Sequence, residues 1–277
     1  MESPAPAKPP TPDLRFIAQG ASAMLYDRGD GHVIKIFRNS VSDEMIAREV
    51  AVSVHANTVG LPTAPALGRH DGEEGRAIVY PYLEGPTLMA WLRRHPVRAG
   101  WALEQMADLH RRISEAPAGQ LRSLKQVLET DISYGPAPMA IKQSAIAYLR
   151  TLPDAPILTH GDFHLGNIMM TDAGLKVIDW SKAAAGHPAA DAVRSEMLMR
   201  FGEGPDDAIT NLWRDWAARH LARCYLTSST FSASDMSMWR PVVALAWLRA
   251  RQAGRAKSFH RYLNKAMAQV NISPILI

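Results

Sequence analysis

The sequence contains few or none of the features that mark several classes of protein. Only one of its 277 residues is a cysteine, Cys224, so neither an internal disulfide nor a cysteine-based zinc site can form. No run of 18 or more uncharged apolar residues occurs, which argues against a transmembrane helix. We therefore expect a cytoplasmic protein with no membrane partner.

The composition favours a folded chain. Hydrophobic residues make up 47% and charged residues 21% of the sequence, which provides enough apolar material for a packed core. The net charge of +4 is small, so we expect no nucleic-acid partner. Residues 1–12 contain five prolines and no apolar segment typical of a secretory signal, and they predict a flexible Pro-rich tail ahead of the fold.

Two regions of different character follow this tail. Residues 13–82 contain β-branched and aromatic runs separated by turns, with one helical segment over 42–57, so they predict a small antiparallel sheet with one helix. Helical spacing dominates residues 87–277, apart from a short β segment at 157–179. The helices expected there span 87–95, 97–114, 121–130, 139–151 and 189–270. The sequence thus predicts an α+β fold with an N-terminal lobe over 13–82, a hinge over 83–86 and a helical C-terminal lobe over 87–277.

The most informative segment is His160-Gly161-Asp162-Phe163-His164-Leu165-Gly166-Asn167, followed after an apolar strand by Ile178-Asp179-Trp180. Phosphoryl transfer needs such a set, because one carboxylate orients or deprotonates a hydroxyl while other oxygens hold Mg²⁺ against nucleotide phosphates. A polar surface hairpin is the alternative, and an isolated Asp-x₄-Asn would favour it. The complete ordered pattern favours the functional interpretation.

This pattern resembles the aminoglycoside phosphotransferase and choline kinase branch of the protein-kinase-like fold, and the resemblance extends from about Phe16 to Asp191. It implies that Asp162 is the catalytic residue, that Asn167 and Asp179 bind magnesium, and that ATP and Mg²⁺ are the cofactors. It also implies that Asp191 hydrogen-bonds the backbone of the catalytic loop. The expected architecture is bilobal, with the nucleotide bound by the N-terminal lobe and the acceptor bound in the helical lobe.

Lys35 lies in the middle of an apolar strand, where a charged side chain is unfavourable unless it finds a partner. Placement on the solvent face of an alternating strand is the alternative. Glu49, in the next helix, favours a partnered lysine, because in the family that this chain resembles a strand lysine contacts the nucleotide phosphates and is held by a helix glutamate. Glu44 is the competing partner, although its place in the first helical turn suits it to stabilising the helix dipole.

Two further segments resemble nucleotide contacts of this family. The turn at 19–23 would cover the phosphates, with Ser22 as a contact, because its small residues let backbone N–H groups approach phosphate oxygens. It has one glycine, Gly20, where protein kinases have three. Residues 79–85 resemble the hinge that binds adenine, through the C=O of Pro81 and the N–H of Leu83. An ordinary hairpin turn and a plain link between lobes are the respective alternatives.

Three functions are compatible with these residues. The first is an ATP-dependent small-molecule kinase that transfers the γ-phosphate to a hydroxyl of an antibiotic, sugar or amino alcohol; with an antibiotic as acceptor, it would be a resistance enzyme. The second, a protein Ser/Thr kinase, is disfavoured because no activation segment follows Asp179. The third, a nucleotide-binding pseudokinase acting as an interaction module, is disfavoured because the whole catalytic set is present. The expected partner is therefore a small-molecule hydroxyl acceptor.

The charge of the C-terminal region is relevant to the charge of the acceptor, because all its ionised side chains are cationic. Residues 236–277 contain no Asp or Glu and seven cations: Arg240, Arg249, Arg251, Arg255, Lys257, Arg261 and Lys265. If these side chains face the cleft, they repel a polycation and favour a neutral or anionic acceptor. A solvated helix face is an equal alternative. Acids outside this region could still assemble a pocket for a polycation: Glu129, Asp131, Glu196, Glu203, Asp206 and Asp207.

Overall fold

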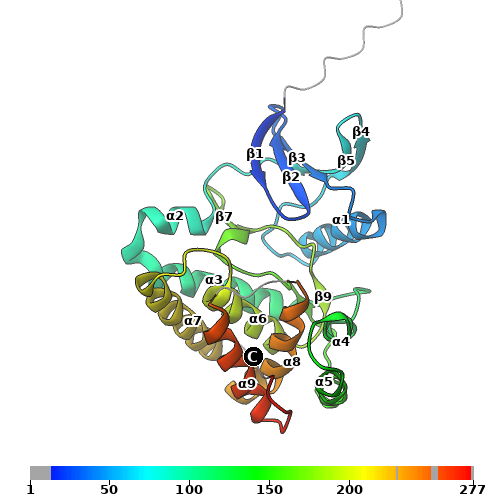
Figure 1. The fold of residues 1–277 in the computed structure, drawn as a ribbon. Helices are drawn as coiled ribbons and strands as arrows, with labels where there is room; N and C mark the ends of the chain where they lie inside the picture. Colours follow the sequence, from blue (N-terminus) through cyan, green and yellow to red (C-terminus); the bar gives the residue numbers. More distant parts are fainter. Residues whose placement is uncertain (1–13, 229, 251–254, 276–277) are drawn as a thin grey trace, which may run out of the picture.

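The N-terminal lobe is built on a five-stranded antiparallel sheet with one helix packed on it (Figure 1). A computed structural model describes residues 14–228, 230–250 and 255–275, so the tail predicted for residues 1–12 lies outside the described residues. The strand order is β1-β2-β3-β5-β4. The elements of this lobe are β1 (Arg15–Gln19), β2 (Ala23–Asp27), β3 (His32–Phe37), α1 (Asp43–Thr58), β4 (Gly68–Gly72) and β5 (Gly75–Pro81).

Side chains of β3 alternate between two buried faces of this sheet. Phe37 packs with Ile46 of α1, and Lys35 lies on the same face because strand side chains repeat every second residue. Ile34 and Ile36 belong to a separate cluster on the other face. Lys35 is only 7% exposed. The solvent-facing alternative for Lys35 is therefore wrong, because a helix covers its face of the strand.

Strand β4 is a part of the sheet that the sequence does not predict. Its five residues include no β-branched or aromatic side chain, so the usual strand signal is missing. It lies at the sheet edge and pairs only with β5. Arg69 of β4 and Arg76 of β5 both donate to the Asp43 carboxylate at the start of α1, at 2.9 and 3.0 Å. These ion pairs join this edge of the sheet to the helix.

The C-terminal lobe consists mainly of helices, with short strand pairs among them (Figure 1). Its helices are α2 (Leu88–Arg94), α3 (Ala99–Ser114), α4 (Leu124–Tyr134), α5 (Met139–Thr151), α6 (Pro188–Phe201), α7 (Ala208–Ser228), α8 (Ala233–Ala250) and α9 (Ala256–Ala268). Its strands are β6 (Leu158–Thr159), β7 (Ile168–Thr171), β8 (Gly174–Val177) and β9 (Ala184–Ala185). β6 pairs with β9 and β7 pairs with β8. The fold is thus the predicted mixture of an antiparallel N-terminal sheet and a helical C-terminal part.

The helix boundaries agree with the sequence prediction to different degrees. Helix α5 spans the predicted residues, whereas α4 begins and ends a few residues later than the predicted 121–130. The polar residue Ser123 occupies the N-cap position of α4 and Gly135 the C-cap position, as is common for these residue types. None of the described helices combines the length and the apolarity needed to cross a membrane.

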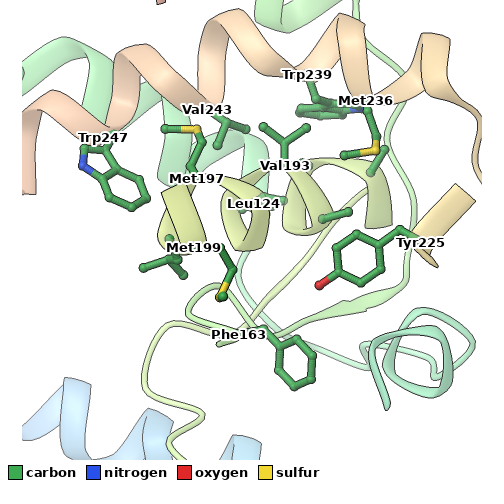
Figure 2. Close-up of a cluster of buried hydrophobic side chains, with 14 of the residues drawn as sticks. Leu124, Phe163, Val193, Met197, Met199, Tyr225, Met236, Trp239, Val243 and Trp247 are labelled. Atoms are coloured by element: carbon green, nitrogen blue, oxygen red, sulfur yellow. The ribbon is translucent and has the colours of Figure 1, made fainter. Parts of the chain in front are cut away.

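Helix α6 is the centre of the C-terminal core. All of its residues except Arg194 and Arg200 are buried, as expected for a helix surrounded by other elements. Figure 2 shows Trp239 and Val243 of α8 on one side of this helix and Phe163 of the 160–167 loop on the other. Because α6 contacts both, it fixes the position of this loop relative to the helices at the C-terminal end.

The two lobes share part of one core. Val52 and Ala56 of α1, together with Leu61, belong to the large apolar cluster of the C-terminal lobe, whereas Ile46 in the first half of α1 packs against the sheet. His55 Nε2 also lies 2.8 Å from the Pro117 carbonyl oxygen. The second half of α1 is therefore attached to the helical lobe.

The predicted hinge crosses between β5 and α2 and is held against β7. The Met170 N–H donates to the Pro86 carbonyl at 2.9 Å. Gly85 has a φ of +124°, and a Cβ there would lie 1.8 Å from the Met170 carbonyl oxygen. Only glycine can occupy this position, because any side chain would collide with the β7 backbone.

Candidate active site

Lys35 is at the centre of a buried ion-pair cluster between the lobes. Its Nζ donates to Glu49 Oε1 at 2.6 Å and to Asp179 Oδ1 at 3.1 Å. The Tyr80 hydroxyl donates to the same Glu49 oxygen at 2.8 Å. Glu44, the competing candidate, instead pairs with Arg48 at 2.6 Å on the surface of α1. The structure therefore places Glu49, and not Glu44, beside Lys35.

Lys35 and Asp179 shift each other's pKa in the direction that favours the charged forms of both. Burial alone would lower the pKa of Lys35, but the Asp179 and Glu49 carboxylates raise that pKa above its usual value. Burial alone would likewise raise the pKa of Asp179, but the Lys35 ammonium and a Ser181 hydrogen bond bring that pKa well below its ordinary value. At neutral pH both groups are therefore charged, as a lysine that binds phosphate and a carboxylate that binds a metal must be.

Asp162 lies on a loop that polar contacts with α6 hold in place. The Asp191 carboxylate accepts hydrogen bonds from the backbone N–H groups of His160 and Gly161 at 2.7 and 2.8 Å. Arg194, one turn further along α6, donates from Nε to the Gly161 carbonyl. Gly161 has a φ of +77°, and a Cβ there would lie 2.4 Å from the Lys182 carbonyl oxygen. The loop that carries Asp162 is thus fixed on both sides of Gly161.

Asp162 is only 8% exposed, and its side chain faces a second lysine. Lys182 Nζ donates to Asp162 Oδ2 at 2.9 Å. Asn167 donates from Nδ2 to the Asp162 carbonyl at 2.9 Å, which fixes the amide with its oxygen side still able to bind a ligand. His160 lies buried beneath the loop, with Nε2 3.1 Å from the Ile178 carbonyl.

Asn167 and Asp179 lie at the two ends of the β7–β8 hairpin. The Ile178 N–H donates to the Asn167 carbonyl at 3.0 Å, so the residues that lead into and out of the hairpin are adjacent. Asp179 has a φ of +62°, a conformation that Asp and Asn tolerate better than most residues. One carboxylate and one amide oxygen fit Mg²⁺, which takes few protein ligands together with phosphate and water oxygens. Among the described residues, no group of three or more His, Cys, Asp or Glu side chains could hold a metal ion.

The remaining predicted nucleotide contacts lie on the N-terminal lobe and the hinge. Ser22 is exposed in the β1–β2 turn, and its carbonyl accepts from the Arg38 N–H at 2.9 Å. Pro81 ends β5, and Tyr82 donates its N–H to the Gly31 carbonyl at 2.8 Å. No hydrogen bond among the described residues uses the Leu83 N–H, so this donor is available to a ligand.

Three residues of the site have no counterpart in the sequence analysis: Lys182, Tyr80 and Arg194. Lys182 follows Asp179 by three residues, and Tyr80 lies in the strand before the hinge, so both are close in sequence to predicted site residues. Their polar contacts connect elements far apart in the chain, and a motif spacing does not report such contacts. The signal available was position alone: a lysine and a tyrosine next to the assigned residues.

Solved structures of phosphotransferases share this fold. The chain is similar to aminoglycoside-3'-phosphotransferase of type VIII, with a TM-score of 0.60, 15% identity, and coverage of 85% of this chain and 94% of that one. It is also similar to aminoglycoside phosphotransferase APH(3'')-Id from Streptomyces rimosus in complex with ADP and streptomycin, with a TM-score of 0.56, 16% identity, and coverage of 86% and 94%. A third is a choline/ethanolamine kinase family protein from Mesorhizobium loti, with a TM-score of 0.55, 15% identity, and coverage of 92% and 86%.

These likenesses show that the fold is that of the protein-kinase-like phosphotransferases. No curated protein matches the sequence. The family model described as the phosphotransferase enzyme family (APH) matches residues 13–226, a range that contains the ion-pair cluster and the loop of Asp162. The chain therefore belongs to the phosphotransferase enzyme family.

Proposed function

We propose that the protein is an ATP-dependent kinase that transfers the γ-phosphate to a hydroxyl group of a small molecule. The observation that carries the proposal is the partly buried contact between Lys35 and Asp179, at 3.1 Å, which joins a residue of the N-terminal sheet to the end of the β7–β8 hairpin. A cation that could bind phosphate and a carboxylate that could bind a metal are therefore neighbours between the lobes. The Streptomyces rimosus enzyme of this fold holds ADP and streptomycin, which supports a nucleotide and a small-molecule acceptor.

The Asp162 carboxylate would act on the acceptor hydroxyl. It accepts the hydroxyl proton as that oxygen bonds to the γ-phosphorus and the bond to the β-phosphate oxygen breaks, releasing ADP. Lys182, at 2.9 Å, fixes the carboxylate from the side. Asp191 and Arg194 hold the loop backbone in place, and such positioning supplies much of the rate in phosphoryl transfer.

The nucleotide would be bound from the other side of the cleft. Lys35 would contact the α- and β-phosphates while Glu49 holds its ammonium group in position. The Pro81 carbonyl and the Leu83 N–H would receive adenine, and Ser22 would approach the phosphates. Asn167 and Asp179 would hold Mg²⁺, which when bound neutralises phosphate charge.

The residues near Asp162 favour an acceptor with few positive charges. Lys182 and Arg194 are the cations beside the loop. Three of the six acids that could have formed a pocket for a polycation are in ion pairs: Glu129 with Arg150, Asp131 with Arg249, and Glu196 with Arg200 and Arg240. Asp206 and Asp207 accept hydrogen bonds at the start of α7, and Glu203 is exposed. The ion-paired acids would offer a polycation little uncompensated negative charge.

A protein kinase is less consistent with the structure. Only β9 separates Asp179 from α6, which begins at Pro188, so there is no room for the long activation segment that presents a peptide in protein kinases.

The test is ATP turnover with neutral sugars, macrolide-like compounds, amino alcohols and kanamycin-like polycations as acceptors, and a protein as the comparison. We expect turnover with a small hydroxyl compound of low positive charge and none with the protein. Efficient phosphorylation of polycations, with kcat/KM falling steeply as salt rises, would refute the assignment of acceptor charge. Phosphorylation of the protein alone would refute the proposed function itself.

A further inference from the structure

Helix α9 forms one wall of a cavity in the C-terminal lobe. The cavity, of about 460 Å³, is lined by residues of α6, α7, α8 and α9. The lining residues of α9 recur at spacings of three and four along the helix, so they occupy one face of it: Ser258, Arg261, Tyr262, Lys265 and Ala266, followed by Gln269 at the C-cap position. This face points into the cavity as a continuous stripe.

Cations outnumber carboxylates among the residues that line this cavity. Two lining side chains are acidic, Glu196 and Asp215. Five are cationic: Arg200, Arg240, Arg255, Arg261 and Lys265. The five cations and two carboxylates leave an excess of three positive charges, the difference between the two counts.

Both carboxylates are already shared between arginines. Glu196 lies 3.1 Å from Arg200 and 3.3 Å from Arg240. Asp215 lies 2.8 Å from Arg255 and 4.0 Å from Arg200. Neither acid therefore has charge left to balance a further cation in the cavity.

Arg261 and Lys265 are the cations that remain. Both are exposed, and within the described part of the chain neither has an acidic partner. The Nε of Arg200 is buried there without a hydrogen-bond partner. The cavity thus offers N–H donors from more than one helix to an anion, in addition to its excess charge.

The cavity faces away from the catalytic loop. Arg194 contacts Gly161 of that loop, whereas Glu196 lines the cavity. At about 100° per residue, two residues along a helix are separated by about 200° around its axis. Arg194 and Glu196 therefore lie on opposite sides of α6, and the body of this helix separates the two sites.

We propose that this cavity binds a small polyanion with phosphate or carboxylate groups, at a second site behind the catalytic loop. Guanidinium groups match the geometry of phosphate and carboxylate oxygens, and an anion would offset the repulsion among the five clustered cations. The alternative is a helix face whose cations are simply hydrated. Such a face would not be expected to line a cavity together with arginines of α6 and α8 that pair with the same acid. The proposal extends beyond phosphoryl transfer and does not depend on it.

Calorimetry with pyrophosphate tests this site directly. Magnesium-free buffer weakens binding of the probe at the proposed nucleotide site, and ADP is left out because its diphosphate could itself occupy the cavity. We expect saturable binding to the wild type and binding at least about tenfold weaker to the double variant Arg261→Gln/Lys265→Gln, since both unpaired cations are lost. Both side chains are exposed, so the variant keeps its core, which thermal unfolding verifies.

Lys257→Gln is the matched control. Lys257 is an exposed cation of the same helix, one turn before Arg261, and it does not line the cavity. We expect its variant to bind pyrophosphate as the wild type does. An equal loss in the Lys257 variant would indicate general attraction to a basic surface and would overturn the proposal, as would the absence of saturable binding. Asp162→Asn, which leaves the cavity intact, should bind the probe normally whether or not the kinase proposal holds.

Discussion

The cleft between the lobes and the cavity beside α9 both contain lysines or arginines paired with carboxylates, but the balance of charge differs. In the cleft, two lysines face three carboxylates: Lys35 and Lys182 against Glu49, Asp162 and Asp179. In the cavity, five cations face two carboxylates. These residues between the lobes thus carry an excess of one negative charge, whereas those of the cavity carry an excess of three positive charges. The sign of the excess charge therefore differs between the proposed metal–nucleotide site and the proposed anion site.

The two regions also differ in burial. Lys35 is 7% and Glu49 3% exposed, and a buried charge must be matched almost individually because desolvation is costly. Arg261 and Lys265 are exposed, where unbalanced charge costs little. Substitutions in the cleft should therefore have large effects on activity or stability, whereas those at the mouth of the cavity should change ligand binding alone.

The largest effect is expected for Asp162→Asn. The variant keeps the shape of the side chain but loses the group that accepts the hydroxyl proton. Turnover should fall at least about a hundredfold, the usual scale for a positioned acid–base group, with ATP affinity nearly unchanged. Steady-state kinetics together with calorimetry for Mg-ATP measure both quantities. Turnover close to that of the wild type would show that Asp162 has another role.

Asp191→Asn should have the next largest effect, on stability. Burial alone would raise the pKa of Asp191, but its hydrogen bond with His110 and the neighbouring histidines and backbone N–H bring that pKa below its ordinary 3.8. The carboxylate accepts the His160 and Gly161 N–H groups, and the amide can replace only one of its two oxygens. We expect the free energy of unfolding to fall by about 2 kcal/mol, measured by urea denaturation.

The pH dependence of this loss follows from the sign of the pKa shift. An acid whose pKa is lower in the folded than in the unfolded protein stabilises the fold at pH values above its unfolded-state pKa. That stabilisation is lost as the pH falls through the folded-state pKa. The difference between the wild type and the Asp191 variant should therefore be complete above about pH 5 and should shrink below the ordinary pKa of 3.8. A difference that stays constant down to the acid transition would show that the ionised carboxylate is not the stabilising form.

Asp179→Asn should weaken Mg-ATP binding about tenfold, or 1.4 kcal/mol, because a charged metal ligand becomes neutral. Asparagine is the better substitution than alanine here, since it tolerates the positive φ of +62° at this position. Calorimetry with Mg-ATP and with ATP in EDTA separates the metal contribution from that of the nucleotide. Equal losses under the two conditions would count against the metal role.

The smallest of these effects is a coupling energy. Lys35→Met and Glu49→Gln should each reduce kcat/KM, and the double variant should cost at least about 1 kcal/mol less than the sum, because the residues act as one unit. Glu44→Gln is the control, since Glu44 lies on the same helix, is exposed and pairs with Arg48. Its combination with Lys35→Met should be additive. If the losses of kcat/KM for Lys35→Met and Glu49→Gln were also additive, the two residues would not act as a pair.

The sequence was sufficient to predict those parts of the site whose residues are brought together by a single hairpin or helix. Asn167 directly precedes β7 and Asp179 follows β8 closely, so the hairpin between them brings both residues together without help from the rest of the fold. The position of Glu49 in the second turn of α1, rather than in the first like Glu44, was likewise sufficient to choose between them. The roles assigned to these residues stay predictions.

The contacts that the sequence did not predict join distant elements. Lys35 and Asp179 are 144 residues apart, and their meeting depends on how the lobes pack. Residues 236–277 contain cations and no acids, but several of these cations are paired with acids from other helices. Asp131 pairs with Arg249, Glu196 with Arg240, and Asp215 with Arg255. Arg251 and the terminal carboxylate of Ile277 lie outside the described residues.

The attachment of α1 to the helical lobe has a consequence for how the protein can come apart. Val52, Ala56 and Leu61 are buried in the C-terminal core, and exposing a side chain as large as valine or leucine costs about 1.5–3 kcal/mol. Cutting the chain at the hinge would leave one fragment with these side chains uncovered and the other with an open apolar socket. The two lobes that the sequence separates at residue 82 are therefore expected to melt as a single cooperative unit, with one transition in a calorimetric scan.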